Sequence, residues 1–367
     1  MRRLKRSSNS IDALRGHVNF HAASPVFFES SDLIRLFKNI VCRHPFESNN
    51  KLLSSNDLPA ESLEPFIMNG YRPPSSWKQC MSSLFYLHNE SFNAWTHIVP
   101  IPIFLYIFLS EIFFGKPNIA LSVYLFSVLC FLMGSSFAHT FCCQTSLSKD
   151  AFFIVDYIGL GIFSHGSGIA YVTFAMPLEF HSLNCFPVTS PAILLTALSC
   201  VLSMWGVFQS TRTRKMPPSF FRHILRLASF AVPGLLISIP VLFKVYSCYV
   251  PRQYPNGYCE SSVFWSLQML SCCAAVVFYL SRIPERFYPG KFDVIGHSHN
   301  FFHIFSLFGL YYQYQAILLD KRFHSSLSHV PSLHVVPIIS ILLLCLMSFY
   351  TIFYFRDLLF KEKSKKF

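Results

Sequence analysis

The sequence contains little charge for its length, and this scarcity sets the class of protein. Charged residues make up 13% of the 367 residues, whereas 52% are hydrophobic. Soluble proteins do not contain charge-free runs of roughly twenty residues along most of their length, yet such runs recur here from position 97 onward. Runs of that length cross the hydrocarbon of a bilayer as helices. The composition therefore excludes an ordinary soluble domain and predicts an all-α, polytopic membrane protein.

Other common signals are missing as well. The basic start, Met1 to Arg6, is not followed by an apolar stretch. We therefore expect no cleavable signal peptide, and we expect the first membrane segment to act as the insertion signal. There is no Gly-rich phosphate-binding loop and no nucleophile elbow.

The net charge of +12 does not predict a nucleic-acid partner. Most of it lies in the N-terminal tail, one internal loop and the last dozen residues. This is the pattern of a cytoplasmic membrane surface beside anionic lipid.

The N-terminal part of the chain has a different character. Residues 1–65 are polar, rich in Ser and Asn and without sustained periodicity, which predicts a largely disordered tail. Within it, residues 25–42 have enough apolar side chains for a short amphipathic helix on the membrane. A marginal local helix without a function fits the same pattern, so both interpretations stay open.

Eight apolar segments follow this tail, and the basic residues orient them. The segments are about 97–114, 117–138, 151–174, 188–210, 224–243, 261–281, 294–316 and 333–355. With eight spans and both termini inside, 25 Lys and Arg residues face the cytoplasm and 5 face outside. Because basic residues accumulate on the cytoplasmic side, we expect eight crossing helices and a cytoplasmic N-terminus.

Single residues predict the local shape of some spans. Kinks are expected in the first and fifth segments, at Pro100, Pro102, Pro233 and Pro240. Small residues of the third segment would allow another helix to approach closely; they are Gly161, Ser164 and Gly168. His165 of the same segment is expected to be a hydrogen-bonded packing residue rather than a ligand.

The orientation places the loop cysteines in different compartments. Cys248 and Cys259 flank an external loop and could pair in an oxidising space, with free thiols as the alternative. Cys142 and Cys143 face the reducing cytosol.

Two histidines at helical spacing are the strongest local feature. His299 and His303 lie four residues apart, so on a helix both imidazoles project from one face and can share one ion. Hydrogen bonds between helices are the alternative. His297 points off that face and is a weaker candidate. A tetrahedral site needs a third ligand, for which His139, at the end of the second segment, is the candidate.

Topology tests this metal hypothesis. The second segment ends on the cytoplasmic side, and the third and seventh begin there, so His139, Asp156 and both later histidines fall in one leaflet. An acid inside a span, here Asp156, is functional by default. Ser135 lies one turn before His139 on the same face. This coincidence favours a metal site near the cytoplasmic face.

Three neutral imidazoles and a water suit Zn²⁺ with an open fourth position. Such an ion lowers the pKa of its water to near 7, so that the water can attack an amide or ester. Asp156 could hold that water or relay its proton, and Ser135 could donate to the water or to an oxyanion. The ion could equally only tie three helices together, with Asp156 as an outer partner.

Several further motifs occur in a fixed order along the chain. They are Gly70-Tyr71-Arg72-Pro73; Cys80 and Ser83; His88-Asn89-Glu90 with Asn93, Trp95, Thr96 and His97; Ser135-x-x-x-His139; Asp156-Tyr157-x-Gly159; Pro284 to Asp293; and Ile295 to His299, continued by His303. Together they resemble the signature of the progestin and adiponectin receptor (PAQR) family. The last motif and the eighth segment look like the membrane progestin receptor branch rather than the adiponectin receptors.

The resemblance implies a seven-helix core over residues 66–316 with a zinc ion near the cytoplasmic face. Residues 317–356 then form a loop and an eighth transmembrane helix, and residues 357–367 form a basic cytoplasmic tail. Carried over residue by residue, the ligands are three histidines and the site around the metal contains a serine and an aspartate, namely His139, His299, His303, Ser135 and Asp156.

The branch is described as plasma-membrane steroid receptors with rapid signalling, proposed to involve G proteins. The resemblance thus implies a progestin receptor at the plasma membrane, with a steroid or other apolar lipid as ligand and a G protein or another cytoplasmic signalling protein as partner. The family is also similar to alkaline ceramidases in its metal site. A zinc-dependent intramembrane lipid-amide hydrolase is therefore the alternative.

The orientation argues against the ordinary G-protein-coupled receptor class. A cytoplasmic N-terminus is opposite to that class, and neither an Asp-Arg-Tyr box nor an Asn-Pro-x-x-Tyr motif is present. Any coupling to G proteins would use different surfaces.

Overall fold

Helices account for almost all regular structure in the computed structural model, which describes residues 51–114, 117–177, 180, 190–250, 254–325 and 336–364. These residues contain no strand, and their isolated β-bridge joins Leu53 to Tyr71. The all-α fold class predicted from the sequence is therefore confirmed. The expected tail up to position 50, including the helix proposed for residues 25–42, lies outside the described residues.

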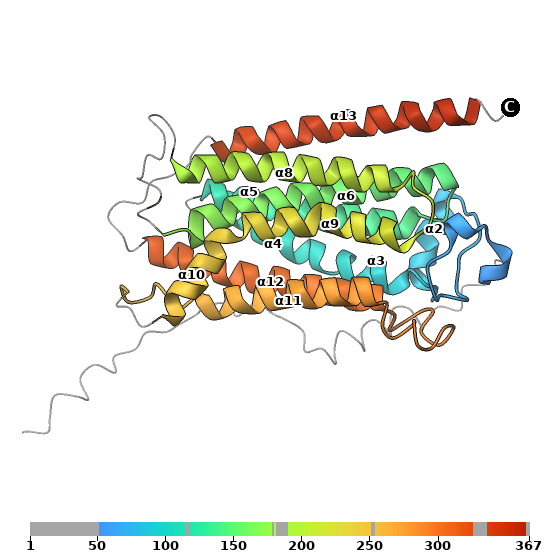
Figure 1. Cartoon of the computed structure of the whole chain (residues 1–367), viewed down its shortest axis with the longest axis horizontal. Helices are drawn as coiled ribbons and strands as arrows, with labels where there is room; N and C mark the ends of the chain where they lie inside the picture. Colours follow the sequence, from blue (N-terminus) through green and yellow to red (C-terminus); the bar gives the residue numbers. More distant parts are fainter. Residues whose placement is uncertain are drawn as a thin grey trace, which may run out of the picture. The chain divides into compact units, whose positions relative to one another are not determined.

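Long helices run side by side in a bundle, with α13 lying along α8 (Figure 1). The helices are α3 Ser91–Ile98, α4 Pro100–Phe113, α5 Ile119–Phe141, α6 Ser146–Ala170, the π-helical turn η5 Tyr171–Ala175, α8 Pro191–Thr213, α9 Phe220–Ile237, α10 Ile239–Tyr249, α11 Ser262–Ser281, α12 Ser298–Ser325 and α13 Val336–Ser364.

Seven stretches among the described residues are long and apolar enough to cross a membrane. They are Ser91–Phe113, Ile119–Phe141, Ser148–Ala175, Pro191–Thr213, Phe220–Ile237, Ser262–Ser281 and Val336–Arg356. α12 packs along α11 in the same bundle but is more polar, since it contains Gln313, Asp320 and several histidines. Each of the eight expected segments therefore corresponds to a helix, and α12 extends to Ser325 instead of ending near residue 316.

The residues that precede α3 are folded against the bundle. They form the short helices η2 Ser55–Asp57, η3 Ala60–Ser62, α2 Trp77–Ser82 and η4 Ser83–Phe85. The Leu53 amide donates to the Tyr71 carbonyl at 2.8 Å, and Lys149 Nζ donates to the Ser62 carbonyl at 3.2 Å. Backbone pairing and this lysine connect residues 51–65 to the rest of the bundle.

Of the four prolines at which the sequence predicted kinks, Pro100 and Pro240 lie at breaks between helices, whereas Pro102 lies inside α4 and Pro233 inside α9. The first span is split into α3 and α4 directly before Pro100. The fifth apolar segment is split into α9, which ends at Ile237, and α10, whose first turn contains Pro240. At the start of α6, the Thr145 hydroxyl accepts a hydrogen bond from the Ser148 amide at 3.0 Å. This N-cap satisfies one of the backbone N–H groups that have no partner within the helix.

Small residues let α6 pack closely against α8, as expected. A Cβ at Gly161 would come within 2.3 Å of a valine side chain on α8, and one at Gly168 within 2.8 Å of Ser199 Cβ. His165 is fully buried between them, with its ring nitrogens 2.7 Å from Ser199 Oγ and 2.8 Å from Ser340 Oγ. The prediction that His165 is a hydrogen-bonded packing residue is confirmed.

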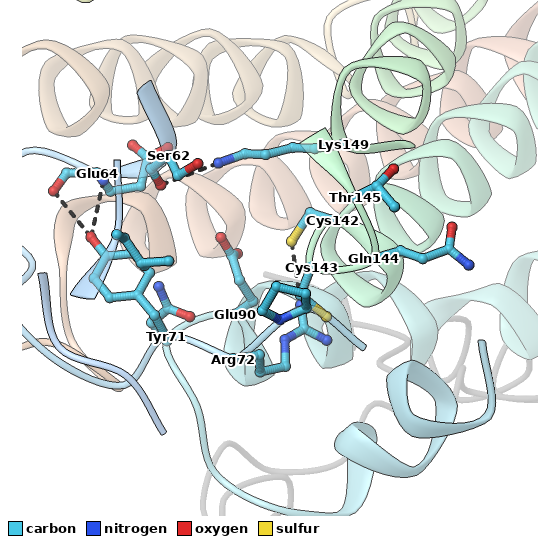
Figure 2. Close-up of a pocket in the computed structure, with 13 residues that line it drawn as sticks. Ser62, Glu64, Tyr71, Arg72, Glu90, Cys142, Cys143, Gln144, Thr145 and Lys149 are labelled. Carbon is cyan, nitrogen blue, oxygen red and sulfur yellow. Dashed lines mark hydrogen bonds between the residues drawn. The ribbon is translucent and has the colours of Figure 1, made fainter. Parts of the chain in front are cut away.

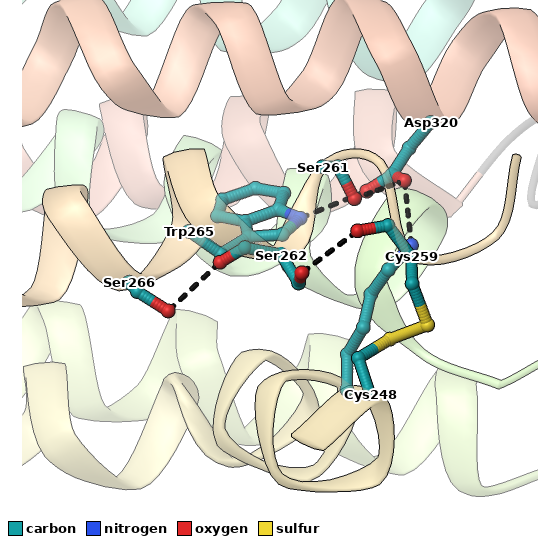
Figure 3. Close-up of a disulfide and its surroundings, with 8 residues drawn as sticks. Cys248, Cys259, Ser261, Ser262, Trp265, Ser266 and Asp320 are labelled. Carbon is teal, nitrogen blue, oxygen red and sulfur yellow. Dashed lines mark hydrogen bonds and ion pairs between the residues drawn. A yellow bond between two sulfur atoms is a disulfide. The ribbon is translucent and has the colours of Figure 1, made fainter. Parts of the chain in front are cut away.

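The end of the bundle at α10 contains a disulfide between Cys248 and Cys259 (Figure 3). It joins the last turn of α10 to the residues before α11, so the pairing that the sequence left open is formed. Nearby, Lys244 of α10 and Asp320 of α12 form a fully buried ion pair, with Nζ and Oδ1 2.5 Å apart. We call this end the α10 end.

Candidate metal centre

Three histidines meet at the end of the bundle opposite to α10. We call this end, where α2 lies, the α2 end (Figure 1). His139 lies in the last turn of α5, and His299 and His303 lie in the first two turns of α12. One ligand atom from each histidine lies within 4.8 Å of those of the other two. His139 and His303 are buried, and His299 is half-buried. The structure brings together the three residues that the sequence predicted as ligands.

The fixed start of α12 positions two of these rings. The Glu285 carboxylate accepts both the backbone amide and the hydroxyl of Ser298, the first residue of the helix. His299 and His303 then occupy consecutive turns, with their Nε2 atoms 3.3 Å apart. The His139 ring approaches from α5, and its centroid lies 5.3 Å and 4.9 Å from those of the other two rings.

Hydrogen bonds on the outer side of the rings define which nitrogens face the centre. Glu90 Oε2 lies 2.7 Å from His139 Nδ1, and because an ionised carboxylate only accepts, that Nδ1 carries the hydrogen. Thr96 Oγ1 lies 3.0 Å from His303 Nδ1 and gives its own hydrogen to the Asn93 carbonyl, so it too accepts from the ring. The Nε2 lone pairs of His139 and His303 are therefore available to a ligand.

This donor set fits a zinc ion. Neighbouring nitrogen lone pairs in a buried space repel one another unless a proton or a cation lies between them. Three neutral imidazole nitrogens suit Zn²⁺ and leave its fourth position open. The hard cations Ca²⁺ and Mg²⁺ require oxygen ligands, which the three rings do not provide.

Glu90 is the residue of this site that sequence reasoning missed. It directly precedes α3, and its carboxylate accepts from Asn93 Nδ2 at 2.7 Å as well as from His139. Asn93 Oδ1 in turn accepts from Asn300 Nδ2 at 2.7 Å, which links α3 to the first turn of α12. Burial alone would raise the pKa of Glu90, but the adjacent His139 ring holds that pKa well below its usual value. The only sequence signal for Glu90 was its place in the motif before the first span.

Ser135 and Asp156, predicted to act around the metal, lie at the same end of the bundle. Ser135 is buried one turn before His139 on α5. Asp156 lies where α6 touches α5, since a Cβ at Gly134 would be 3.4 Å from its Cα. The described contacts contain no hydrogen bond from either side chain to the three rings, so both roles stay predictions.

Two neighbouring histidines lie outside the cluster. His297 Nε2 lies 3.0 Å from Asn300 Nδ2, and His297 is not among the residues that could share an ion, in agreement with its position off the ligand face. His97 of α3 stacks on the His303 ring, with centroids 4.3 Å apart. Among the described residues, neither ring nitrogen of His97 has a hydrogen-bond partner. Its contribution is to fix the plane of the His303 ring.

A polar pocket of about 130 Å³ lies beside the centre (Figure 2). Its lining includes charged side chains and thiols, among them Glu64, Arg72, Glu90, Cys142, Cys143 and Lys149. Arg72 donates to the carbonyls of His139 at 2.6 Å and Thr140 at 2.7 Å, and so satisfies backbone acceptors at the end of α5. Glu90 lies between this pocket and His139, which connects the pocket to the three rings.

Comparisons with known proteins cover most of this fold. The model of the haemolysin-III-related family matches residues 85–314, more than half of the chain. Membrane progestin receptor gamma-A of Danio rerio is 31% identical over 305 residues, covering 78% of this chain and 87% of the relative. Membrane progestin receptor gamma of Homo sapiens is 30% identical over 277 residues, covering 74% and 82%. Membrane progestin receptor delta of Mus musculus is 30% identical over 278 residues, covering 74% and 79%. The chain therefore belongs to the haemolysin-III-related family that includes the progestin and adiponectin receptors, and within it is similar to the membrane progestin receptors.

Proposed function

We propose that this protein is a plasma-membrane receptor for a progestin or similar steroid, built around a zinc ion held by His139, His299 and His303. The observation that carries the proposal is the similarity to proteins named membrane progestin receptors over 74% to 78% of this chain. Its partners would be an apolar ligand, the lipid bilayer and a cytoplasmic signalling protein such as a G protein.

The charge distribution supports a cytoplasmic α2 end. The connection from α8 to α9 reaches this end and is basic, and its Arg214 pairs with Asp150 at the start of α6. The Cys248–Cys259 disulfide lies at the other end, which suits an oxidising compartment. Because basic loops stay in the cytoplasm, the metal centre would face the cytoplasm and the basic loops would meet the signalling partner.

An apolar crevice of about 280 Å³ between α8 and α13 offers a place for such a ligand. Aromatic side chains from both helices line it, namely Trp205, Phe208, Tyr350 and Tyr354. Ligand pockets are mostly apolar with a few polar groups, and Ser348 and Thr351 supply hydroxyls here. α8 leads directly into the basic α8–α9 connection. A ligand in the crevice would therefore contact a helix that reaches the cytoplasmic surface.

Binding of labelled progesterone to the purified full-length protein in lipid nanodiscs tests the receptor function. We expect saturable binding, weakened by Trp205→Ala in the crevice. Val201→Ala is the matched control, because Val201 lies on the same helix, is 57% exposed and does not line the crevice. Absence of saturable steroid binding would refute the receptor function, whereas equal binding by both variants would refute only the crevice.

A second candidate function is hydrolysis of a ceramide-like lipid amide. The observation that favours it is the set of three histidines together with an acid, Asp156, which lies on the neighbouring helix α6 beside Gly134 of α5. A bound zinc ion supplies a Lewis acid that polarises a carbonyl and acidifies a water. Asp156 would hold the attacking water and accept its proton. The Ser135 hydroxyl would donate to the carbonyl oxygen as it gains charge, and Glu90 would keep the His139 ring oriented.

Release of sphingoid base from ceramide, measured by mass spectrometry, tests this second function. His303→Ala and Asp156→Asn should each abolish the release, whereas Asp156→Asn should still bind zinc. Equal release by the wild type and His303→Ala would contradict it. Steroid binding that persists in Asp156→Asn, together with absent hydrolysis in the wild type, would leave the receptor function alone.

A further inference from the structure

The α2 end contains another pair of facing side chains, the thiols of Cys80 and Cys143, whose sulfur atoms lie 3.5 Å apart. Cys80 lies within α2, and Cys143 follows the end of α5. Cys80 is fully buried, whereas Cys143 is half-buried and lines the polar pocket next to Cys142 (Figure 2). One thiol of the pair therefore borders the pocket, and the other is fully buried.

Other contacts hold the two segments together around this pair. The Ser75 amide, just before α2, donates to the Cys143 carbonyl at 3.1 Å. Arg72 bridges the same segments, because its guanidinium donates to Ser83 Oγ and to the Thr140 carbonyl, each at 2.7 Å. Since a disulfide has sulfurs about 2.05 Å apart, the two sulfurs need to approach by about 1.5 Å. Rotation of the two side chains can supply a movement of this size while the backbone contacts persist.

We propose that Cys80 and Cys143 form a reversible disulfide by exchange with a low-molecular-weight disulfide of the glutathione type. Cys143, deprotonated, attacks one sulfur of the small disulfide, whose S–S bond breaks and releases one small thiol. Cys80 then attacks the Cys143 sulfur of the mixed disulfide and releases the second small thiol. The protein loses two protons and two electrons, and the small disulfide takes them up as it becomes two thiols. This site is separate from the proposed receptor function and requires neither zinc nor steroid.

Closure of this pair would add a covalent link between α2 and the end of α5 that carries His139. In the reduced protein, hydrogen bonds from Arg72 and Ser75 make that connection. Oxidation would therefore fix the segment that borders the metal centre and the polar pocket.

The test uses full-length protein in nanodiscs, equilibrated with mixtures of oxidised and reduced glutathione. Free thiols are alkylated after denaturation, and linked peptides are identified by mass spectrometry. We expect a Cys80–Cys143 peptide pair that grows with oxidised glutathione and is lost with reduced glutathione, while the Cys248–Cys259 pair stays intact. Cys143→Ser should abolish the new pair. Cys142→Ser is the matched control and should retain it, because the Cys142 sulfur accepts from Arg72 at 3.3 Å.

Phenylarsine oxide tests the same pair in the wild-type chain, since it bridges two adjacent thiols with loss of water. It should protect Cys80 and Cys143 from later alkylation and leave Cys142 reactive. A stable glutathione adduct on Cys143 without the cross-link, a Cys142–Cys143 disulfide, or neither cross-link nor arsenical protection would each overturn the proposal.

Discussion

Two buried polar clusters lie at opposite ends of this bundle, and they differ in how their polar atoms are satisfied. At the α10 end, the Asp320 carboxylate accepts from Lys244 Nζ, Ser261 Oγ and Trp265 Nε1 at 2.5 Å to 2.8 Å (Figure 3). The lysine ammonium also lies 4.6 Å from the centroid of the Tyr258 ring. At the α2 end, ring nitrogens of three histidines face one another within 4.8 Å.

This difference separates a cluster that holds helices from one that can bind an ion. The opposite charges at the α10 end neutralise each other, and further donors form hydrogen bonds with the carboxylate oxygens, as a buried charge requires. The cluster joins α10, α11 and α12, and the disulfide closes the connection between the first two. The histidines instead present lone pairs that only a proton or a cation satisfies. The comparison predicts that changes at the α2 end alter metal content, whereas changes at the α10 end alter stability.

Removal of two ligand histidines should have the largest effect. The His139→Ala, His299→Ala double variant is expected to lose its zinc, from about one ion per chain in the wild type, because one imidazole cannot retain the ion. Elemental analysis of the purified protein measures the metal. Lys244→Met is the control and should keep its zinc. Equal zinc in the double variant and the wild type would show that the three rings are not the site.

Breaking the ion pair at the α10 end should have the next largest effect. Lys244→Met leaves the Asp320 charge buried without its partner, which is expected to lower the free energy of unfolding by about 3–5 kcal/mol. Unfolding in detergent titrations measures it, and Lys244→Met combined with Asp320→Leu should recover most of the loss.

The partly exposed Glu111–Lys321 pair, 2.7 Å apart, provides the control for that measurement. Glu111→Gln should cost less than about 1 kcal/mol, because solvent screens this pair. Equal losses from the two substitutions would mean that the Lys244–Asp320 pair does not stabilise the bundle more than a partly exposed pair does.

Weakening the hydrogen bond that orients one of the ligands, His139, should have a smaller effect. Glu90→Gln keeps an acceptor near His139 Nδ1 but removes the charge, so zinc affinity is expected to fall by about 10–100-fold. Competition with a chelator measures the affinity. Glu64→Gln is the matched control, because Glu64 lines the same pocket and its carboxylate pairs with Arg282, 3.9 Å away. If both variants lose affinity equally, the pocket charge and not the Glu90–His139 contact is responsible.

The sequence predicted the histidine cluster because helical spacing and topology are both readable in it. The spacing of His299 and His303 places them on one face, and the positions of the spans bring His139 to the same end of the bundle. Both inferences depend only on segments whose helical state follows from long apolar runs.

Residues outside those runs could not be placed in the same way. Glu90 and Cys80 lie in the stretch before α3, whose course is fixed by contacts of Arg72 and Tyr71 rather than by any periodicity. Lys244 directly follows the fifth apolar segment, and nothing near it in sequence indicates its partner Asp320, which is 76 residues away. Buried pairs between distant segments leave no local pattern, and they are the features that only the structure revealed.

The smallest effect is expected at His297, which tests whether a satisfied histidine beside the centre takes part in it. His297 Nε2 lies 3.0 Å from Asn300 Nδ2, and its ring is parallel to that of His299 with centroids 6.5 Å apart. In His297→Gln the amide oxygen can still accept from Asn300, so the connection through Asn93 to Glu90 persists. Zinc content should stay unchanged in elemental analysis, and chelator competition should show a smaller loss of affinity than in Glu90→Gln. A loss as large as that of Glu90→Gln would mean that a histidine outside the ligand set, whose ring is already hydrogen-bonded, still controls zinc affinity. Hydrogen-bond satisfaction would then no longer distinguish the metal-binding cluster at the α2 end from the stabilising cluster at the α10 end.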